Sequence, residues 1–168
     1  YSASKAASDH LVRAWVRTYN LQATISNCSN NYGPNQHPEK LIPATIGKVM
    51  KGEKPHVYGN GLNVRDWIHV DDHTDGIMQV LDKGQIGDSY LFGARNQLNN
   101  LQVVRKILEI MGKPEDFIDF VADRPGHDAK YAIDPSYAER NLAWRPAHNN
   151  LMDELPQLVD HYTSSIES

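Results

Sequence analysis

The sequence has too little cysteine and too few apolar runs for several classes of protein. Its one cysteine, Cys28, can form no internal disulfide and no structural zinc site, which fits a reducing compartment and argues against a disulfide-stapled secreted scaffold. No stretch approaches the roughly 18 apolar residues that favour a membrane span. No basic-then-apolar leader precedes the first helical segment, so no signal peptide is expected either. A cytoplasmic location is the simplest expectation.

Positive charge and phosphate-binding loops are scarce as well. Acidic residues outnumber basic ones 21 to 17, which gives a net charge of -4, so nothing favours a nucleic acid partner, and a phosphate would have to be bound by local groups. The sequence has no Gly-x-Gly-x-x-Gly string after a strand-like run and no Walker-type loop. The chain therefore lacks a dinucleotide-phosphate loop of its own.

The remaining composition is that of an ordinary folded domain. The chain has 168 residues, of which 40% are hydrophobic and 23% charged, so it can form a core and does not resemble collagenous or disordered sequences. It begins at Tyr1 rather than at a methionine, within a segment of helical spacing. We expect it to be part of a longer protein.

Hydrophobic periodicity predicts helices that alternate with short strands. The predicted helices are 2–18, 39–50, 71–83, 99–111, 135–142 and 151–166, and the strand-like runs are 23–28, 57–58, 66–70, 89–93 and 117–121. Asp71 or Asp72 is expected to cap one helix and Asn99 or Asn100 another. The polar string 29–34 is expected to be a loop. The alternation indicates an α/β fold.

Tyr1 and Lys5 place a phenol and an ammonium four residues apart, which on a helix puts both on one face. A nearby cation favours the phenolate, so a group with an ordinary pKa of about 10 comes closer to useful proton transfer. The pair is a candidate acid–base site. Alone it is weak evidence, because a chain with 8 tyrosines produces such short motifs by chance.

Further polar residues are candidates for ligand binding. The asparagine-rich string 27–34 offers donors and acceptors at the end of a strand, where α/β sheets commonly bind ligands, although an asparagine-rich turn is the alternative. Arg65 and Arg124, each beside a predicted turn, can hold a pyrophosphate through bidentate contacts or pair structurally with aspartate. Lys40 can pair with a phosphate or be solvated.

Histidine and tryptophan give weaker signals. His69 and His73 have the spacing of some metal sites, but they span a strand-to-helix boundary and no third ligand is evident, so no metal is expected. Trp15, Trp67 and Trp144 are interpreted as core or interface aromatics.

In six strings taken in order, the chain resembles the bacterial dTDP-glucose 4,6-dehydratases, members of the extended short-chain dehydrogenase/reductase family: YSASK, NCSNNYGP, EKLIP, VYGNG, VRDWIHVDDH and ADRPGHD. The resemblance runs from Tyr1 to about Pro146. It implies the C-terminal part of an NAD(P)-binding Rossmann-fold enzyme, mainly its smaller mixed α/β substrate-binding domain. Residues 1–30 would be the last helix and strand of the Rossmann domain, and 31–168 the nucleotide-sugar portion.

The resemblance also implies roles for single residues. Tyr1 and Lys5 match the catalytic pair, which also contacts the cofactor NAD, and Asn31 matches a cofactor-side asparagine. The positions that match contacts to the nucleotide sugar are Asn30, Lys40, Leu41, His56, Tyr58, Arg65, Asn100, Arg124 and His127. No role is assigned after residue 147.

For the whole enzyme, the resemblance implies the NAD-dependent dehydration of dTDP-glucose to its 4-keto-6-deoxy form. Tyr1 would take the proton of the sugar 4-hydroxyl while NAD accepts hydride from C4; water then leaves across C5 and C6, and hydride returns to C6. In the family, the residues that perform the elimination lie upstream of the tyrosine, so this chain alone is expected to be inactive. The resemblance also implies a homodimer of the full-length protein.

Two kinds of alternative stay open. The chain can belong to another epimerase or dehydratase that acts on a UDP or GDP sugar. It can also be a noncatalytic nucleotide-sugar binding module or a purely structural domain.

Overall fold

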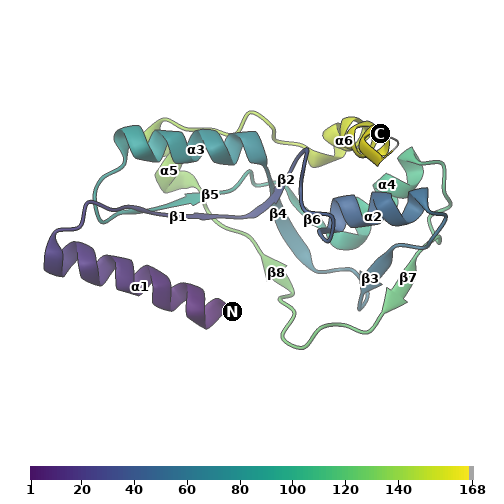
Figure 1. Cartoon of the computed structure of the whole chain (residues 1–168), viewed down its shortest axis with the longest axis horizontal. Coiled ribbons are helices and arrows are strands. Elements are labelled where there is room, and N and C mark those ends of the chain that lie inside the picture. Colours follow the sequence, from purple (N-terminus) through teal and green to yellow (C-terminus); the bar gives the residue numbers. More distant parts are fainter. Residues whose placement is uncertain (167–168) are drawn as a thin grey trace.

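A computed structural model describes residues 1–166, in which helices and short strands alternate (Figure 1). The helices are α1 Ser2–Tyr19, α2 Leu41–Met50, α3 Val70–Lys83, α4 Asn100–Ile110, α5 Ser136–Leu142 and α6 Leu151–Ile166. The strands are β1 Ile25–Cys28, β2 Asn30–Tyr32, β3 His56–Tyr58, β4 Val64–His69, β5 Ser89–Phe92, β6 Gln97–Asn99, β7 Asp119–Val121 and β8 Lys130–Tyr131. The predicted α/β fold is confirmed.

The described strands form three small sheets, and the long strand β4 is the centre of one of them. β1 pairs with β5 and β3 with β7, both in parallel. In the remaining sheet the order is β2-β4-β6, and β8 also pairs with β4. The first half of β4 pairs with β6 and β8, and its second half pairs with β2. β4 therefore holds together segments that lie far apart in the sequence.

Buried side chains form separate clusters on the two sides of β4. Trp67 belongs to a cluster built from α2, α4 and α6, whereas its neighbour Ile68 packs with Tyr90, Phe92 and Trp144 near α3 and α5. Figure 1 shows the first group of helices at one end of the molecule and the second at the other. The prediction that Trp67 and Trp144 belong to the core is confirmed, since their exposed fractions are 3% and 2%.

The boundary expected after residue 30 falls within β2, the strand that follows β1 and lies in a different sheet. The chain later returns to the first of these sheets, because β5 pairs with β1 from Ile25 opposite Ser89 to Cys28 opposite Phe92. Elements from both sides of the boundary therefore share one sheet. The division into a Rossmann part and a substrate part stays a prediction.

The helix α1 forms as its spacing predicts but lies apart from the rest of the described chain (Figure 1). None of its residues is buried, and the exposed fractions of Leu11 and Trp15 are 62% and 54%. Trp15 is thus no part of the described core. The contacts from α1 to the body include hydrogen bonds from Arg13 to Ser89 and from Asn27 to Asp9.

Some local predictions are wrong for identifiable reasons. The string 29–34 is not wholly a loop, because residues 30–32 form β2 against β4. His69, rather than Asp71 or Asp72, caps α3, and its side chain accepts a hydrogen bond from Asp71 N. Asn99 caps α4 as expected, in a capping box with Gln102. β6 and β8 were not predicted, since strands of three and two residues carry too little periodicity.

Asp72 has a different task, which leads to a stability prediction. Its buried carboxylate accepts hydrogen bonds from Ala147 N and His148 N, both at 2.9 Å, and so holds the loop that enters α6. Asp72→Ala removes both acceptors, so it should lower the free energy of unfolding by about 1–3 kcal/mol. The control is Asp75→Ala, at an exposed position of α3, which should change it by less than about 0.5 kcal/mol. Urea titrations followed by tryptophan fluorescence measure both, and equal losses would contradict the assignment.

Candidate functional site

A pocket of about 460 Å³ lies where α2, β3, β4, the start of α4 and the loop 123–128 meet. This volume falls within the usual range of small-molecule sites, roughly 300–1,000 Å³. All nine residues that the sequence predicts for substrate binding line it: Asn30, Lys40, Leu41, His56, Tyr58, Arg65, Asn100, Arg124 and His127. The fold therefore brings together positions that are spread over almost 100 residues of sequence.

Arg65 and Arg124 form one wall of the pocket. Two donors of Arg65 are bound to carbonyl oxygens, those of Val64 at 2.7 Å and Asp128 at 2.9 Å, which leaves others free. Burial, opposed by the Asp128 charge and reinforced by the Arg124 charge, lowers the pKa of Arg65. Two like charges this close are most stable with an anion between them.

The loop 123–128 sets the direction of Arg124. Its guanidinium lies over the ring of Tyr58, 5.2 Å from the centroid, and its Nη2 is 3.1 Å from Nε2 of His127. A guanidinium only donates, so His127 Nε2 accepts, and the proton of the ring lies on Nδ1, which is 2.7 Å from a carboxylate oxygen of Asp123. Hydrogen bonds from His127 and the Arg124 backbone lower the pKa of Asp123. The loop thus presents a fixed cation.

The lining also contains residues that the sequence analysis did not assign to a site. Glu39, Lys48 and Trp67 also line the pocket. The Nζ atom of Lys48 lies 3.2 Å from Nε2 of His56. The signal for Lys48 was available, because it lies eight residues, or about two helical turns, beyond Lys40. Trp67 follows Arg65 by two residues and so faces the same side of β4.

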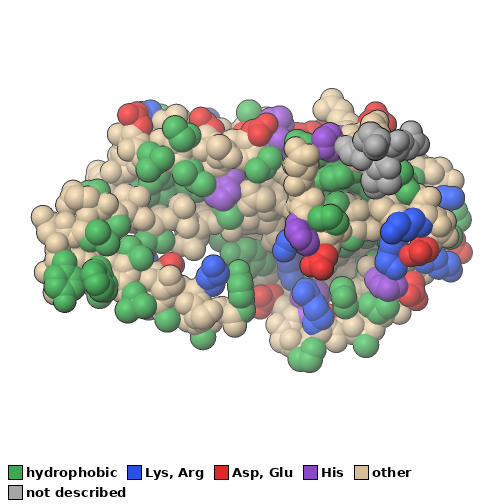
Figure 2. All heavy atoms as spheres, viewed as in Figure 1, with side chains coloured by type: hydrophobic (Ala, Val, Ile, Leu, Met, Phe, Trp, Pro, Cys, Tyr) green, Lys and Arg blue, Asp and Glu red, His purple; other side chains and the backbone are tan. Residues whose placement is uncertain are grey.

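The pocket is a local concentration of positive charge on an acidic protein. Its lining has four cationic side chains, those of Lys40, Lys48, Arg65 and Arg124, against the single carboxylate of Glu39. In Figure 2, Lys, Arg and His side chains gather on the part of this face that belongs to α2, β3 and β8. Such a lining favours a ligand with more than one negative charge.

Tyr1, Lys5 and Asn31 do not line this pocket. The side chain of Tyr1 is 93% exposed at the start of α1, and Lys5 Nζ lies 5.7 Å from its ring centroid. Burial, with the charges of Cys28 and Tyr1 adding to it, raises the pKa of Tyr131, so Tyr1 lies within electrostatic range of β8. Because Tyr131 pairs with Arg65, the candidate acid–base pair lies beside the pocket rather than in it.

Comparison with known proteins places this geometry in a family. The model of the family described as GDP-mannose 4,6 dehydratase matches residues 1–154. The chain belongs to this family. Its relatives within the family include the dTDP-glucose 4,6-dehydratase of Mycolicibacterium smegmatis, 53% identical over 98% of the chain. A second, from Mycobacterium tuberculosis, is 52% identical over 96% of the chain. The resemblance to dTDP-glucose 4,6-dehydratases is therefore confirmed, and the chain spans about half the length of these relatives.

Solved structures agree with this placement in the GDP-mannose 4,6 dehydratase family. The dTDP-glucose 4,6-dehydratase of Streptomyces venezuelae, solved with NAD bound, is 42% identical and matches with a TM-score of 0.95 over 99% of this chain and 52% of its own. The dTDP-glucose 4,6-dehydratase of Bacillus anthracis, solved in complex with NAD, is 41% identical. It matches with a TM-score of 0.93 over 99% of this chain and 53% of its own. The chain thus has the fold of the C-terminal half of these structures.

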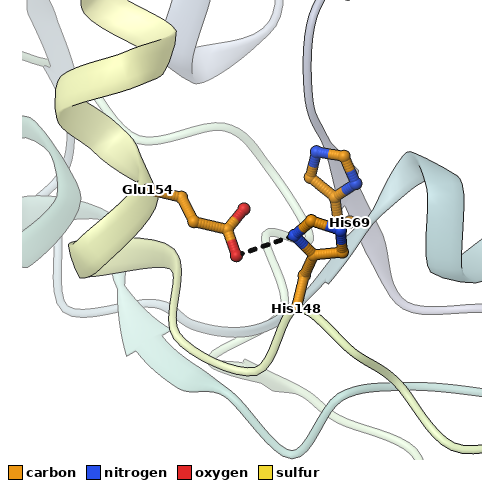
Figure 3. A group of neighbouring side chains, drawn as sticks. All are labelled: His69, His148 and Glu154. Carbon is orange, nitrogen blue, oxygen red and sulfur yellow. Dashed lines mark hydrogen bonds and ion pairs between the residues drawn. The ribbon is translucent and has the colours of Figure 1, made fainter.

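The family model ends at residue 154, inside α6. Glu154 belongs to a cluster of polar side chains with His69 and His148 (Figure 3). His69 does not meet His73, as the sequence spacing suggested, but stacks on His148 with ring centroids 4.1 Å apart and planes at 22°. His148 Nδ1 donates to Glu154 Oε1 at 3.0 Å, and Tyr32 donates to Glu154 Oε2 at 3.2 Å. Burial and the Glu154 charge raise the pKa of Tyr32, so the phenol stays protonated.

His69, His148 and Glu154 have the residue types of a metal site, and one ligand atom of each lies within 4.8 Å of the others, but the two imidazole rings are stacked. Nitrogen lone pairs lie in the plane of an imidazole, so two nearly parallel stacked rings do not point at a common ion. His69 Nδ1 already accepts a hydrogen bond from Asp71 N at 3.2 Å. The arrangement fits a structural link between α6 and β2.

A second link joins α6 to the segment after β2. The hydroxyl of Tyr162 donates to Gly33 O at 2.8 Å and accepts from Gln36 N at 2.9 Å. Gln36 in turn donates from its side chain to Asn31 O at 2.8 Å. α6, for which the sequence gave no role, therefore holds the strand that carries Asn30 and Asn31.

This link can be tested by removing a single oxygen atom. Tyr162→Phe leaves Gln36 N–H without its acceptor and Gly33 O without its donor, so the free energy of unfolding should fall by about 1–2 kcal/mol. Tyr19→Phe is the matched control, because Tyr19 is exposed and its described contact is the ring of Trp15. Thermal unfolding of both variants measures the difference, and an unchanged Tyr162→Phe variant would refute the link.

Proposed function

We propose that the protein to which this chain belongs is a dTDP-glucose 4,6-dehydratase, and that the chain supplies its nucleotide-sugar pocket together with the catalytic Tyr1 and Lys5. The observation that carries the proposal is that the nine positions named from the family resemblance line one cationic pocket. The relatives of about 50% identity that bear this name support the choice of substrate. The part of the relatives that this chain does not match would supply the rest of the active site.

Within the pocket, the proposed roles follow from chemistry and position. Arg65 and Arg124 would bind the diphosphate, since free guanidinium donors from two segments suit bidentate contacts to adjacent phosphates. Lys40 would add a charge at the start of α2. His56 and Tyr58 on β3 would lie at the thymine, and Asn30, Leu41, Asn100 and His127 would line the remaining wall.

Tyr1, with the Lys5 ammonium 5.7 Å from its ring centroid, would take the proton of the sugar 4-hydroxyl. The chemistry that bound NAD would supply there is the acceptance and return of a hydride. Of the residues that would hold NAD, this chain offers Tyr1, Lys5 and Asn31, which suit the reacting end alone, because no glycine-rich phosphate loop is present. The elimination of water would depend on carboxylates outside this chain.

The proposal extends to the setting of the enzyme. Among the described residues, no helix is both long and apolar enough to cross a membrane. We infer a cytoplasmic protein that binds neither membrane nor nucleic acid. The exposed apolar side chains of α1, Leu11 and Trp15 among them, suit a homodimer of the full-length protein.

A GDP sugar is the second candidate substrate, because the matching family model is described by GDP-mannose. Binding of dTDP, UDP and GDP to the full-length protein, each measured by calorimetry, separates the candidates. We expect dTDP to bind at least about tenfold tighter than GDP. Tighter binding of GDP would reject the proposed substrate, and binding without turnover of dTDP-glucose would favour a noncatalytic module.

Removing one of the two guanidinium groups tests the diphosphate site. Arg65→Leu should weaken dTDP binding by about 10- to 100-fold, since it removes charge-assisted contacts to phosphate. Arg105→Leu, on the exposed side of α4 and paired with Glu115 at 3.7 Å, is the control and should leave affinity unchanged. Calorimetry at two salt concentrations measures both, and equal affinities in all three proteins would contradict the assignment.

The acid–base role of Tyr1 predicts a separation of turnover from binding. Tyr1→Phe in the full-length protein should lower kcat by about 10²- to 10⁴-fold, because the general base is lost. Its affinity for dTDP should stay within about twofold, since Tyr1 lies outside the pocket. Formation of the keto sugar is followed by its absorbance in alkali. A loss of binding as large as the loss of turnover would indicate a structural role instead.

A further inference from the structure

His73 makes the contact that points beyond the proposed function. It lies on α3, half-buried near Phe92, with ring centroids 6.0 Å apart. Its Nδ1 is 2.9 Å from Oδ1 of Asn31, the residue proposed to face the cofactor. The sequence spacing had linked His73 to His69 instead, so this contact gives His73 a different role.

The neighbours of Asn31 determine which way its amide points. Asn31 Nδ2 lies 3.2 Å from the carbonyl oxygen of Ser29, which only accepts hydrogen bonds. A flipped amide would place two acceptors against each other there, so the amide oxygen must face His73. His73 Nδ1 then carries the proton. Burial lowers the pKa of His73, which favours the neutral ring.

Most of the hydrogen-bonding capacity of the Asn31 side chain is already used. Its Nδ2 has two hydrogens, and it lies 3.2 Å from Cys28 Sγ as well as 3.2 Å from Ser29 O. Its Oδ1 has two lone pairs, one of which accepts from His73. One lone pair on the oxygen remains, so Asn31 can serve a ligand only as an acceptor.

The amide oxygen of Asn31, the acceptor, lies near the residues proposed to react with the substrate. Asn31 contacts Cys28, and the charges of Cys28 and Tyr1 both act on Tyr131. Asn31 and the group proposed to exchange the proton, Tyr1, therefore both lie in the region around Cys28 and Tyr131. At that end of NAD, the N–H donor is the amino group of the nicotinamide carboxamide.

We propose that His73 is a positioning residue that holds the Asn31 amide so that its oxygen accepts a hydrogen bond from the nicotinamide carboxamide. This inference rests on the proposed use of NAD. It adds which partner donates the hydrogen bond and which accepts it, and it names His73 as the residue that fixes this direction. His73 acts through Asn31 and need not touch the cofactor itself.

A pair of substitutions separates this role from packing. In His73→Asn the side-chain Nδ2 can replace the imidazole Nδ1, whereas in His73→Gln the donor lies one bond further along, in the place of Nε2. In the full-length protein, His73→Asn should keep NAD affinity within about twofold, and His73→Gln should weaken it about five- to tenfold. Affinity for dTDP should be the same in both variants, which controls for folding. Equal NAD affinities in the two variants would overturn the proposal.

A cofactor analogue tests the partner of the acceptor. The 3-acetylpyridine analogue of NAD has a methyl group in place of the carboxamide amino group, so it has no N–H to donate. The preference of the wild-type protein for NAD over the analogue should persist in His73→Asn and shrink at least about threefold in His73→Gln. The same preference in all three proteins would overturn the assignment of the carboxamide.

The tautomer of His73 can be measured without any turnover. Nitrogen NMR of the full-length protein with labelled histidine should show Nδ1 protonated and Nε2 unprotonated for the signal that disappears in His73→Gln. The opposite tautomer would overturn the inference even in a fully active dehydratase. The expected tautomer in a protein that proves inactive on dTDP-glucose would leave the contact standing while the proposed reaction fails.

Discussion

The register of β4 is the constraint on which the rest of the structure depends. Successive residues of a strand point to opposite faces, so Arg65 and Trp67 face the pocket while Asp66 is buried on the other side. There the Asp66 carboxylate accepts from Asn96 N at 2.8 Å and lies so close to Gly93 that a side chain at that glycine would collide with it. A slip of one residue would bury Arg65 and put a carboxylate among the cations, which would destroy both core and pocket.

The pocket shows how a chain of net charge -4 can offer a site for a polyanion. Its four cations come from three parts of the fold: Lys40 and Lys48 from α2 and its N-cap, Arg65 from β4, and Arg124 from the loop 123–128. Neutral groups, the Asp128 carbonyl and the ring of Tyr58, satisfy and orient the two guanidinium groups. Carboxylates in the same places would have neutralised the charge that a diphosphate requires.

How much the sequence could predict depended on the length of each element. Helices of ten residues or more, such as α2 and α4, carry enough periodicity to be found, whereas β2, β6 and β8 exist because β4 pairs with them, which no local pattern records. The cap of α3 was assigned to an aspartate by propensity, but Asp72 is committed to the loop before α6, and His69 takes its place. The nine pocket positions came from a family resemblance; periodicity along α2 would have added Lys48.

Side chains alternate in direction along β2 as they do along β4. Asn30 lines the cationic pocket, and on its side Tyr32 packs with Trp67 in the core. Asn31, between them, points the other way, toward His73 and Cys28. Because neighbouring side chains on a strand diverge, two adjacent asparagines face two different surroundings. The links from α6 to Tyr32, Gly33 and Gln36 keep this short strand in place, so the C-terminal helix stabilises the strand that separates the pocket from the contacts of Asn31.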